Sequence, residues 1–378
     1  MKDQLELPLP GWLTTEMAAT QQNPRYHREG SVLAHTQYVL QQYFALRDQF
    51  DLTDEERDIL YWTAVLHDIG KIRATVWQDN RWRSPGHERA GVPMALNILL
   101  DRSEVPAAMR NRILDLIRWH GYPLRFSQWQ QPISDLKLLG TRVDLRLLGI
   151  FGLMDFHGRD CDDKVDVLAR MDEFNKVSVP KAEYELGRFK DLQAAHQGWN
   201  LRHKNAAWNA IQLKDARLLE KLISASLTDE IVTRGQRITF VTGLPFAGKS
   251  TWISKNLPEA FHIQLAEHEI TNALGDNDFL LERKMVEFRH LLRVYLNRHQ
   301  HVVMETRPIK EQVRLELLTA FKDMQVTIDY VVVEATFDTI RSGAEHEQLW
   351  SNEALERLLV DQDILHPWEA HRIQYVQS

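Results

Sequence analysis

The chain has 378 residues, of which 44% are hydrophobic and 26% are charged, and its formal net charge is −7 at pH 7. This composition is typical of a soluble globular protein, and the length predicts two domains rather than one. An acidic chain is not expected to bind nucleic acid over its whole surface, so any such contact must be local. The single cysteine, Cys161, excludes an intramolecular disulfide. With no secretory signal and no apolar run of about 18 residues, we expect a cytoplasmic protein without a membrane span.

Helical periodicity extends over most of residues 28–225. The segment from Ser31 to Arg47 is amphipathic, and Thr53 to Glu56 has the spacing of a capping box. That box opens a helix that ends at His67-Asp68, with Gly70 as its predicted C-cap. Further helices are predicted over Ala107–His120, Arg142–Phe156 and Lys181–Ser226.

The pattern changes at the polar stretch Leu227–Gln236, which we interpret as a domain junction. It separates an all-α domain, residues 1–230, from an α/β domain, residues 235–378. In the second domain strands alternate with helices, which indicates a parallel sheet. The strands are predicted over Arg237–Thr242, Phe261–Leu265, His301–Met304 and Val326–Glu334. The helices are predicted over Ser250–Asn256, Phe279–Arg298, Lys310–Phe321 and Asn352–Asp363.

Six polar residues of the helical half fall on apolar helix faces or at helix ends. They are His35, His67, Asp68, His87, His120 and Asp155. One buried histidine is usually a hydrogen-bonded core residue, but six such residues would need six separately satisfied environments. One shared metal site explains them together, because neutral imidazole and carboxylate are metal ligands at pH 7. The two oxygens of Asp68 are enough to bridge two ions.

The strings around these residues resemble the HD-domain phosphohydrolase superfamily over roughly the first 180 residues. The matching strings are Glu29–Thr36, Ala64–Lys71, Pro85–Glu88, Trp119–Gly121 and Asp155–Arg159. The resemblance implies an all-helical fold that hydrolyses phosphomonoesters or phosphodiesters. It implies that the six residues bind two divalent transition-metal ions, with His87 and His120 belonging to the version with more than one metal. Mn, Fe, Co, Ni and Zn all suit such a mixed site.

Two cations near the predicted ligands each have two interpretations. Lys71 follows Asp68 by one turn and either pairs with a phosphoryl oxygen or is a solvated lysine that complements the helix dipole. Arg159 is either a phosphate-binding fork or a surface arginine. In a two-metal mechanism the ions hold the phosphate and activate a bridging water that attacks phosphorus. The candidate catalytic residues of this half are therefore Asp68, Lys71 and Arg159.

The segment Gly243–Ser250 fits the pattern G-x-x-x-x-G-K-[ST] at every fixed position, between a predicted strand and a predicted helix. Backbone N–H groups of such a loop bind the phosphates of ATP, and the helix N-terminus adds positive charge. Lys249 would reach the β- and γ-phosphates, and Ser250 would hold Mg²⁺. The residues predicted to bind ATP are Gly243, Leu244, Pro245, Phe246, Ala247, Gly248, Lys249, Ser250 and Thr251.

This half resembles the small P-loop kinases of the polynucleotide 5′-hydroxyl kinase group. The resemblance extends to Lys310–Arg314 and to Pro367–Tyr375. In the second segment Arg372 resembles a residue that contacts the adenine or a phosphate of ATP. An HD domain followed by such a kinase resembles the bacterial bifunctional end-healing enzymes. In that family the HD module removes 2′,3′-cyclic phosphate or terminal 2′- or 3′-phosphates, and the kinase module phosphorylates the 5′-OH.

The chain departs from that kinase group after its second strand, where His268 and Thr271 replace the usual Asp and Arg. Glu267 or Glu269 is then the candidate general base, being the right chemical type. Glu305 also stands where the Asp of a D-x-T-N string would be. Lys249 remains the candidate catalytic cation of this half.

The predicted function is a bifunctional enzyme that acts on RNA or DNA ends and uses ATP. Two alternatives stay open: an HD hydrolase of small nucleotides, and an HD phosphoesterase regulated by an ATP-binding pseudokinase. The basic and aromatic stretch Arg188–Trp208 is either a nucleic-acid surface or a helix with a solvated face. The sequence does not determine the oligomeric state or the choice between RNA and DNA.

Overall fold

The computed structural model describes residues 6–140, 142–183, 236–264, 292–306, 314, 326–347, 365, 370 and 372–377. The chain divides into two compact units, Met1–Asp191 and Leu192–Ser378. Each unit has its own hydrophobic core. The predicted boundary at residues 230–235 and most of the predicted helix Lys181–Ser226 lie outside the described residues. Within the described ranges, every helix is too short or too polar to cross a bilayer.

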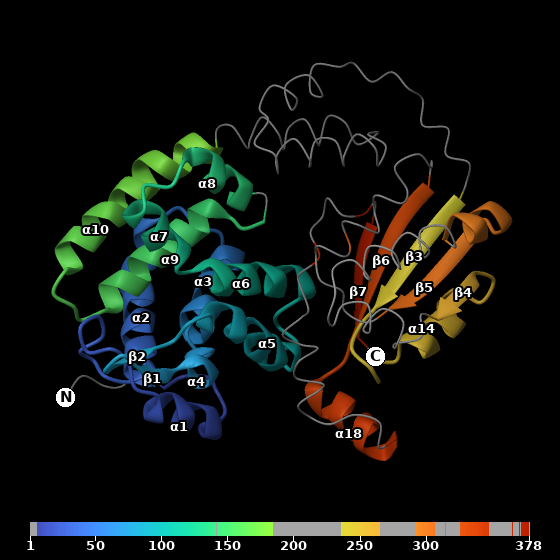
Figure 1. Cartoon of the computed structure of the whole chain (residues 1–378), viewed down its shortest axis with the longest axis horizontal. Coiled ribbons are helices and arrows are strands. Elements are labelled where there is room, and N and C mark those ends of the chain that lie inside the picture. The colour runs from blue at the N-terminus through green and yellow to red at the C-terminus, as the bar shows by residue number, and fades with distance from the viewer. Residues whose placement is uncertain are drawn as a thin grey trace. The chain divides into compact units, whose positions relative to one another are not determined.

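The first unit is helical, as its periodicity predicts (Figure 1). Its α-helices are α1 (Gly11–Ala19), α2 (Val32–Leu46), α3 (Asp54–Leu66), α4 (Lys71–Ala74), α5 (His87–Leu100), α6 (Ala107–Trp119), α7 (Tyr122–Gln128), α8 (Ile133–Gly140), α9 (Leu145–Gly158) and α10 (Lys164–Glu173). A short 3-10 helix, η1 (Arg47–Gln49), follows α2, and a short π-helix, η2 (Phe174–Ser178), follows α10. Helix α9 is central, because it packs on α2, α3, α6, α7 and α10.

Side-chain caps fix where the helices that carry the site begin. Helix α2 starts with the Ser31 hydroxyl accepting the N–H of Ala34. Helix α3 starts with the predicted capping box, in which Thr53 Oγ1 accepts the N–H of Glu56 and Glu56 Oε2 accepts the N–H of Thr53. Asp144 caps α9 in the same manner as Ser31 caps α2. These bonds satisfy N–H groups that a helix end leaves unpaired, and they set the phase of each apolar face.

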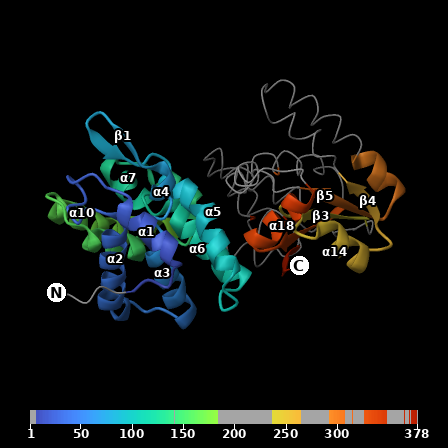
Figure 2. The ribbon, with the colours of Figure 1, turned by 90° about the horizontal axis from the view of Figure 1, so that it is seen from below.

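The helical unit also contains a β-hairpin, which the periodicity did not predict. It consists of β1 (Val76–Gln78) paired with β2 (Arg81–Arg83), and it projects beyond the neighbouring helices (Figure 2). Asp79 and Asn80 form the turn with φ values of 52° and 56°. Asp and Asn tolerate this left-handed conformation, which matches the twist of a two-residue hairpin turn. The strands are too short for an alternating pattern to be visible in the sequence.

Gly70 is not the left-handed C-cap that the sequence predicted. Its φ is −63°, and it directly precedes α4. A Cβ at this position would lie 2.1 Å from the carbonyl oxygen of His87 and 2.4 Å from the backbone nitrogen of Gly91. Glycine is therefore needed because the first turn of α5 crosses the backbone at this point. The crossing brings His87 next to Asp68.

The second unit is built on a parallel sheet in the order β4-β5-β3-β6-β7, which confirms the predicted α/β architecture (Figure 1). The strands are β3 (Gln236–Thr242), β4 (Phe261–Gln264), β5 (His301–Thr306), β6 (Val326–Glu334) and β7 (Arg372–Gln377). The sequence predicted the first four and missed β7. The described helices are α14 (Lys249–Asn256), α18 (Phe337–Glu347) and the helical residues 292–298. Phe240 and Tyr330 stack at 4.9 Å in the core of the sheet.

Candidate metal centre

The six predicted metal ligands converge at one point of the helical unit. They are His35 on α2, His67 and Asp68 after α3, His87 at the start of α5, His120 after α6 and Asp155 near the end of α9. All except His87 are at most 3% exposed. Five helices that are distant in sequence thus direct polar side chains to one buried point, and burying these polar groups costs free energy unless a ligand compensates them.

The two carboxylate oxygens of Asp68 face different imidazoles. Oδ2 lies 3.6 Å from Nε2 of His35 and 3.3 Å from Nε2 of His67. Oδ1 lies 3.4 Å from Nε2 of His87 and 3.7 Å from Nε2 of His120. The six predicted ligands make up two groups whose possible ligand atoms lie within 4.8 Å of one another: His35, His67 and Asp155; and Asp68, His87 and His120. Each oxygen of Asp68 thus lies beside a different pair of imidazoles, and the carboxylate could be shared between two ions.

Hydrogen bonds set the tautomer of three of these rings. The Nδ1 atoms of His67, His87 and His120 lie 3.1, 2.8 and 2.8 Å from backbone carbonyl oxygens three residues earlier, to which they donate. In a neutral ring the lone pair then lies on Nε2. The Nε2 atoms of His87 and His120 are 3.2 Å apart, so two lone pairs face each other. Nε2 of His67 and Oδ1 of Asp68 are buried without a hydrogen-bond partner. A cation on each side of Asp68 satisfies all of these atoms, so the residues present fit a two-ion site.

The protonation states of His120, Asp68 and Asp155 also suit metal binding. Burial, reinforced by the neighbouring imidazoles, lowers the pKa of His120 to about 3 and keeps the ring neutral. Burial alone would raise the pKa of Asp68, but the Lys71 ammonium holds it well below its usual range. Burial acts in the same way on Asp155, and the Arg159 guanidinium outweighs it, so this pKa is also well below the usual range. Neutral imidazole and ionised carboxylate are the forms that bind metal.

Lys71 and Arg159 are not the solvated side chains that the sequence left open. Lys71 is 7% exposed, and its Nζ lies 2.7 Å from Oδ2 of Asp68 and donates to Oε1 of Gln22 at 2.6 Å. Arg159 donates from Nε and Nη2 to the two oxygens of Asp155, at 3.2 and 2.5 Å. Both cations therefore lie against predicted ligand carboxylates.

Two buried carboxylates lie beside the ligands, and sequence reasoning missed them. Oε1 of Glu29 lies 2.9 Å from Nδ1 of His35, and Oε2 of Glu88 lies 3.5 Å from Nδ1 of His87. A carboxylate at hydrogen-bond distance, as Glu29 is, orients a metal-bound imidazole and raises its basicity. Glu88 is farther away, because the Nδ1–H of His87 is donated to Ser84. The sequence held a signal for Glu88, which falls one turn before Val92 on the buried face of α5. Glu29 precedes α2 in an irregular segment, where periodicity gives no signal.

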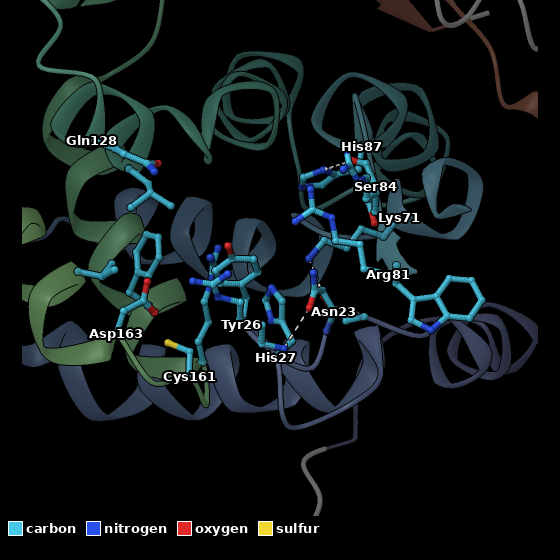
Figure 3. A pocket seen from close by; sticks show the side chains of 18 of the residues that line it. Asn23, Tyr26, His27, Lys71, Arg81, Ser84, His87, Gln128, Cys161 and Asp163 are labelled. Carbon is cyan, nitrogen blue, oxygen red and sulfur yellow. Dashed lines mark hydrogen bonds between the residues drawn. The ribbon is translucent and has the colours of Figure 1, made fainter. Parts of the chain in front are cut away.

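A cavity of about 690 Å³ opens onto the metal centre (Figure 3). In Figure 3, Lys71 and His87 lie on one side of it and Gln128 and Asp163 on the other, with His27 between them. Among the described residues that line it, the cations are Arg25, Lys71, Arg81, Arg83, Arg159 and Arg170, and Asp163 is the one carboxylate. Tyr26, Trp82 and Phe156 supply aromatic rings. The cavity is therefore positive in an acidic chain, and it suits a phosphorylated ligand with an aromatic base.

The predicted phosphate-binding loop lies in the second unit, between the carboxyl end of β3 and α14. A Cβ at Gly243 would lie 2.3 Å from the carbonyl oxygen of Val333, so glycine is needed there. The Ser250 hydroxyl lies 2.9 and 3.1 Å from the two oxygens of Glu305, at the end of the adjacent strand β5. A hydroxyl beside a carboxylate offers the oxygen ligands that Mg²⁺ prefers.

Two further residues predicted to bind ATP, Lys249 and Arg372, differ in where they lie. Lys249 Nζ donates to the carbonyl oxygen of Leu244 at 2.9 Å, within the loop itself. Arg372 is not beside the loop: it opens β7, is in register with Asp329 of β6, and its Nη2 donates to Gln374 at 3.3 Å. The predicted base residues and the basic stretch lie outside the described residues, and these are Glu267, His268, Glu269, Thr271 and 188–208.

The comparison with known proteins supports the metal centre of the helical unit. Residues 32–155 match the family model of the HD domain, a span that begins with α2 and ends at the last predicted ligand. The helical unit therefore contains an HD domain, as the resemblance implied, and this supports a metal-dependent phosphohydrolase.

Two further likenesses are partial. The chain is 36% identical over 104 residues to a multifunctional CCA protein from Thioalkalivibrio sulfidiphilus (strain HL-EbGR7), a match that covers 28% of this chain and 23% of that protein. The chain thus spans about a quarter of the length of that relative. A solved sugar kinase from Janibacter sp. HTCC2649, in an unliganded state, matches 38% of this chain and 85% of its own at 14% identity. Its TM-score of 0.30 is too low to support an argument.

Proposed function

We propose that the helical unit is a two-metal phosphoesterase that removes 2′,3′-cyclic phosphate or 2′- or 3′-phosphate from RNA or DNA ends. The observation that supports it most is that each oxygen of Asp68 faces two imidazoles, those of His35 and His67 at Oδ2 and those of His87 and His120 at Oδ1. One ion would be held by His35, His67 and Asp155 and the other by His87 and His120, with Asp68 shared. Divalent ions at these positions polarise phosphoryl oxygens and lower the pKa of a bound water.

The chain's own cations would bind and orient the phosphate. Two of the three N–H donors of Lys71 are directed to Asp68 and Gln22, which leaves one for a phosphoryl oxygen. Arg159 uses two N–H groups on Asp155, and its remaining donors suit a second oxygen of the same phosphate. Both residues line the cavity. The phosphate would therefore be held beside the carboxylates that carry the ions.

The test uses an end-labelled RNA with a 2′,3′-cyclic phosphate, incubated with the protein and Mn, Fe, Co, Ni or Zn in turn. Wild type is expected to remove the phosphate with at least one of these metals, and Asp68→Asn to lose both the activity and bound metal. Asp172→Asn, the same chemical change at an exposed residue of α10, is the matched control and should behave as wild type. Undiminished metal content and activity in Asp68→Asn would refute the proposal.

A second proposed activity belongs to the α/β unit, which would bind Mg²⁺-ATP and phosphorylate a 5′-OH end. The pairing of Ser250 with Glu305 beside the loop supports it. Wild type is expected to transfer the γ-phosphate of ATP to 5′-OH RNA, and Lys249→Ala to abolish the transfer. If wild type gives no such product while Lys249→Ala changes the phosphoesterase rate, the unit is instead an ATP-binding regulator.

A further inference from the structure

The β1–β2 hairpin is held against the metal centre at its base. Lys71 shortly precedes β1, and His87 shortly follows β2. The hydroxyls of Thr75 and Ser84 lie 2.8 Å apart and close the base of the hairpin. The carbonyl oxygen of Ser84 accepts the Nδ1–H of His87 at 2.8 Å. The position of the hairpin is thus coupled directly to a metal ligand, and its tip projects into solvent (Figure 2).

Two tryptophans form one face of this hairpin. Trp77 and Trp82 are directly opposite each other in the antiparallel register, so their side chains share a face. Their rings pack edge to face with centroids 5.0 Å apart. Trp82 lines the cavity, whereas Trp77 lies outside the lining and is 57% exposed. The pair therefore makes an aromatic path that leads from the cavity to solvent, and an exposed tryptophan there adds nothing to the core.

The charges near this path are mainly positive, and the one carboxylate of the hairpin, Asp79, lies 2.7 Å from Arg83. Arg81 and Arg25 line the cavity and stand close in sequence to the aromatic residues Trp82 and Tyr26. The guanidinium of Arg25 lies 5.5 Å from the ring centroid of Tyr26. Arginine beside exposed aromatic rings is the combination that binds single-stranded nucleic acid, because rings stack on bases and guanidinium groups bind phosphates. The same charges disfavour a purely apolar protein partner.

We propose that the hairpin binds the last nucleotides of a single-stranded 3′ end, with the terminal base on Trp82, the preceding base on Trp77 and the backbone at Arg81. The proposal rests on the phosphoesterase function proposed above and names its substrate as a strand, not a free nucleotide. A free nucleotide would reach Trp82 and the metal centre but would not reach Trp77.

The two substrates therefore separate the roles of the tryptophans. The test compares kcat/KM for a single-stranded RNA of about ten nucleotides ending in a 2′,3′-cyclic phosphate with that for a 2′,3′-cyclic mononucleotide. Trp77→Ala is expected to lower the value for the strand about 5- to 100-fold, the effect of losing one stacked base, and to leave the mononucleotide unchanged within about twofold. Trp77→Phe keeps a ring and should retain most of the activity on the strand.

The control is Trp12→Ala, which removes a tryptophan that is 61% exposed on α1 and outside the cavity lining, and it should change neither value. Arg81→Gln is expected to reduce the salt dependence of strand binding, with the slope of log K against log salt smaller by about 0.7. No loss on the strand in Trp77→Ala, or an equal loss on both substrates, would overturn the proposal.

Failure of the phosphoesterase function would be recognised separately. Fluorescence anisotropy measures the binding of a labelled single strand with a 3′-OH end, which needs no turnover. If wild type hydrolyses neither substrate but binds the strand more tightly than Trp77→Ala does, the hairpin binds nucleic acid and the proposed hydrolysis is wrong. If wild type hydrolyses both substrates and Trp77→Ala binds the strand as tightly as wild type, the hairpin proposal is wrong and the phosphoesterase stands.

Discussion

Gly70→Ala is expected to open the metal centre without removing any ligand. The added Cβ would lie 2.1 Å from the carbonyl oxygen of His87, and 2.4 and 2.8 Å from the backbone nitrogen and Cα of Gly91. All three atoms belong to backbone, so no side chain can rotate away. Ordinary contact between carbon atoms begins near 3.5 Å, and the first turn of α5 must therefore retreat by about 1 Å.

That displacement exceeds what a metal ligand tolerates. A histidine nitrogen binds a divalent ion at about 2.1 Å, with a tolerance of about 0.2 Å. His87 would move away from Oδ1 of Asp68, and the ion shared with His120 would be lost first. The strain is expected to lower the free energy of unfolding by about 1–3 kcal/mol, as overpacking does in other cores.

Elemental analysis by mass spectrometry and urea unfolding measure the two effects. Wild type is expected to retain two ions per chain and Gly70→Ala one, with a lower unfolding midpoint. Gly11→Ala is the control, because a Cβ there meets nothing within 4 Å, and it should change stability by less than about 1 kcal/mol. Two retained ions and an unchanged midpoint in Gly70→Ala would refute the role assigned to this close approach.

Three other outcomes are expected. Glu29→Gln should weaken metal binding about 10- to 100-fold in a metal titration, because the carboxylate no longer orients His35; unchanged affinity would contradict this. In the metal-free protein the pKa of His120 is about 3, below its ordinary 6.5, so folding favours the neutral ring; that stability is present above pH 6.5 and is lost as the pH falls toward 3. The urea midpoint should fall across this window, less steeply in His120→Asn, and parallel curves would argue against a buried neutral ring. Glu305→Gln should lower Mg²⁺-dependent ATP affinity about tenfold in calorimetry while phosphoesterase activity is kept, since a charge-assisted contact with Ser250 and the ion is removed. Equal ATP affinity in wild type and Glu305→Gln would show that the Glu305 carboxylate does not take part in binding Mg²⁺-ATP.

The metal ligands could be predicted because helical periodicity alone places His35, His120 and Asp155 on apolar faces. A polar residue on such a face is conspicuous in the sequence, and the structure brings all six predicted ligands together. Glu29 could not be found in this way, because it contacts His35 from an irregular segment. The residues that line the cavity could not be predicted either, because Arg25 and Arg81 come from segments that only the fold brings together.

The fold was predictable where elements are long and regular. Four strands and helices α2, α3, α6, α9 and α14 follow from their patterns, whereas helix α1, the three-residue strands of the hairpin and the edge strand β7 do not. Gly70 shows the limit most clearly: a glycine after a helix suggests a left-handed cap, but its role depends on where α5 crosses. Sequence position carries no information about such an approach.

The central claim is that Asp68 bridges two metal ions. Anomalous X-ray scattering from a crystal of the Mn²⁺-loaded protein tests it most directly. We expect two peaks about 3.5–4 Å apart on either side of the Asp68 carboxylate. One should lie beside Nε2 of His35 and His67, and the other beside Nε2 of His87 and His120. A single peak, or peaks away from Asp68, would contradict the claim.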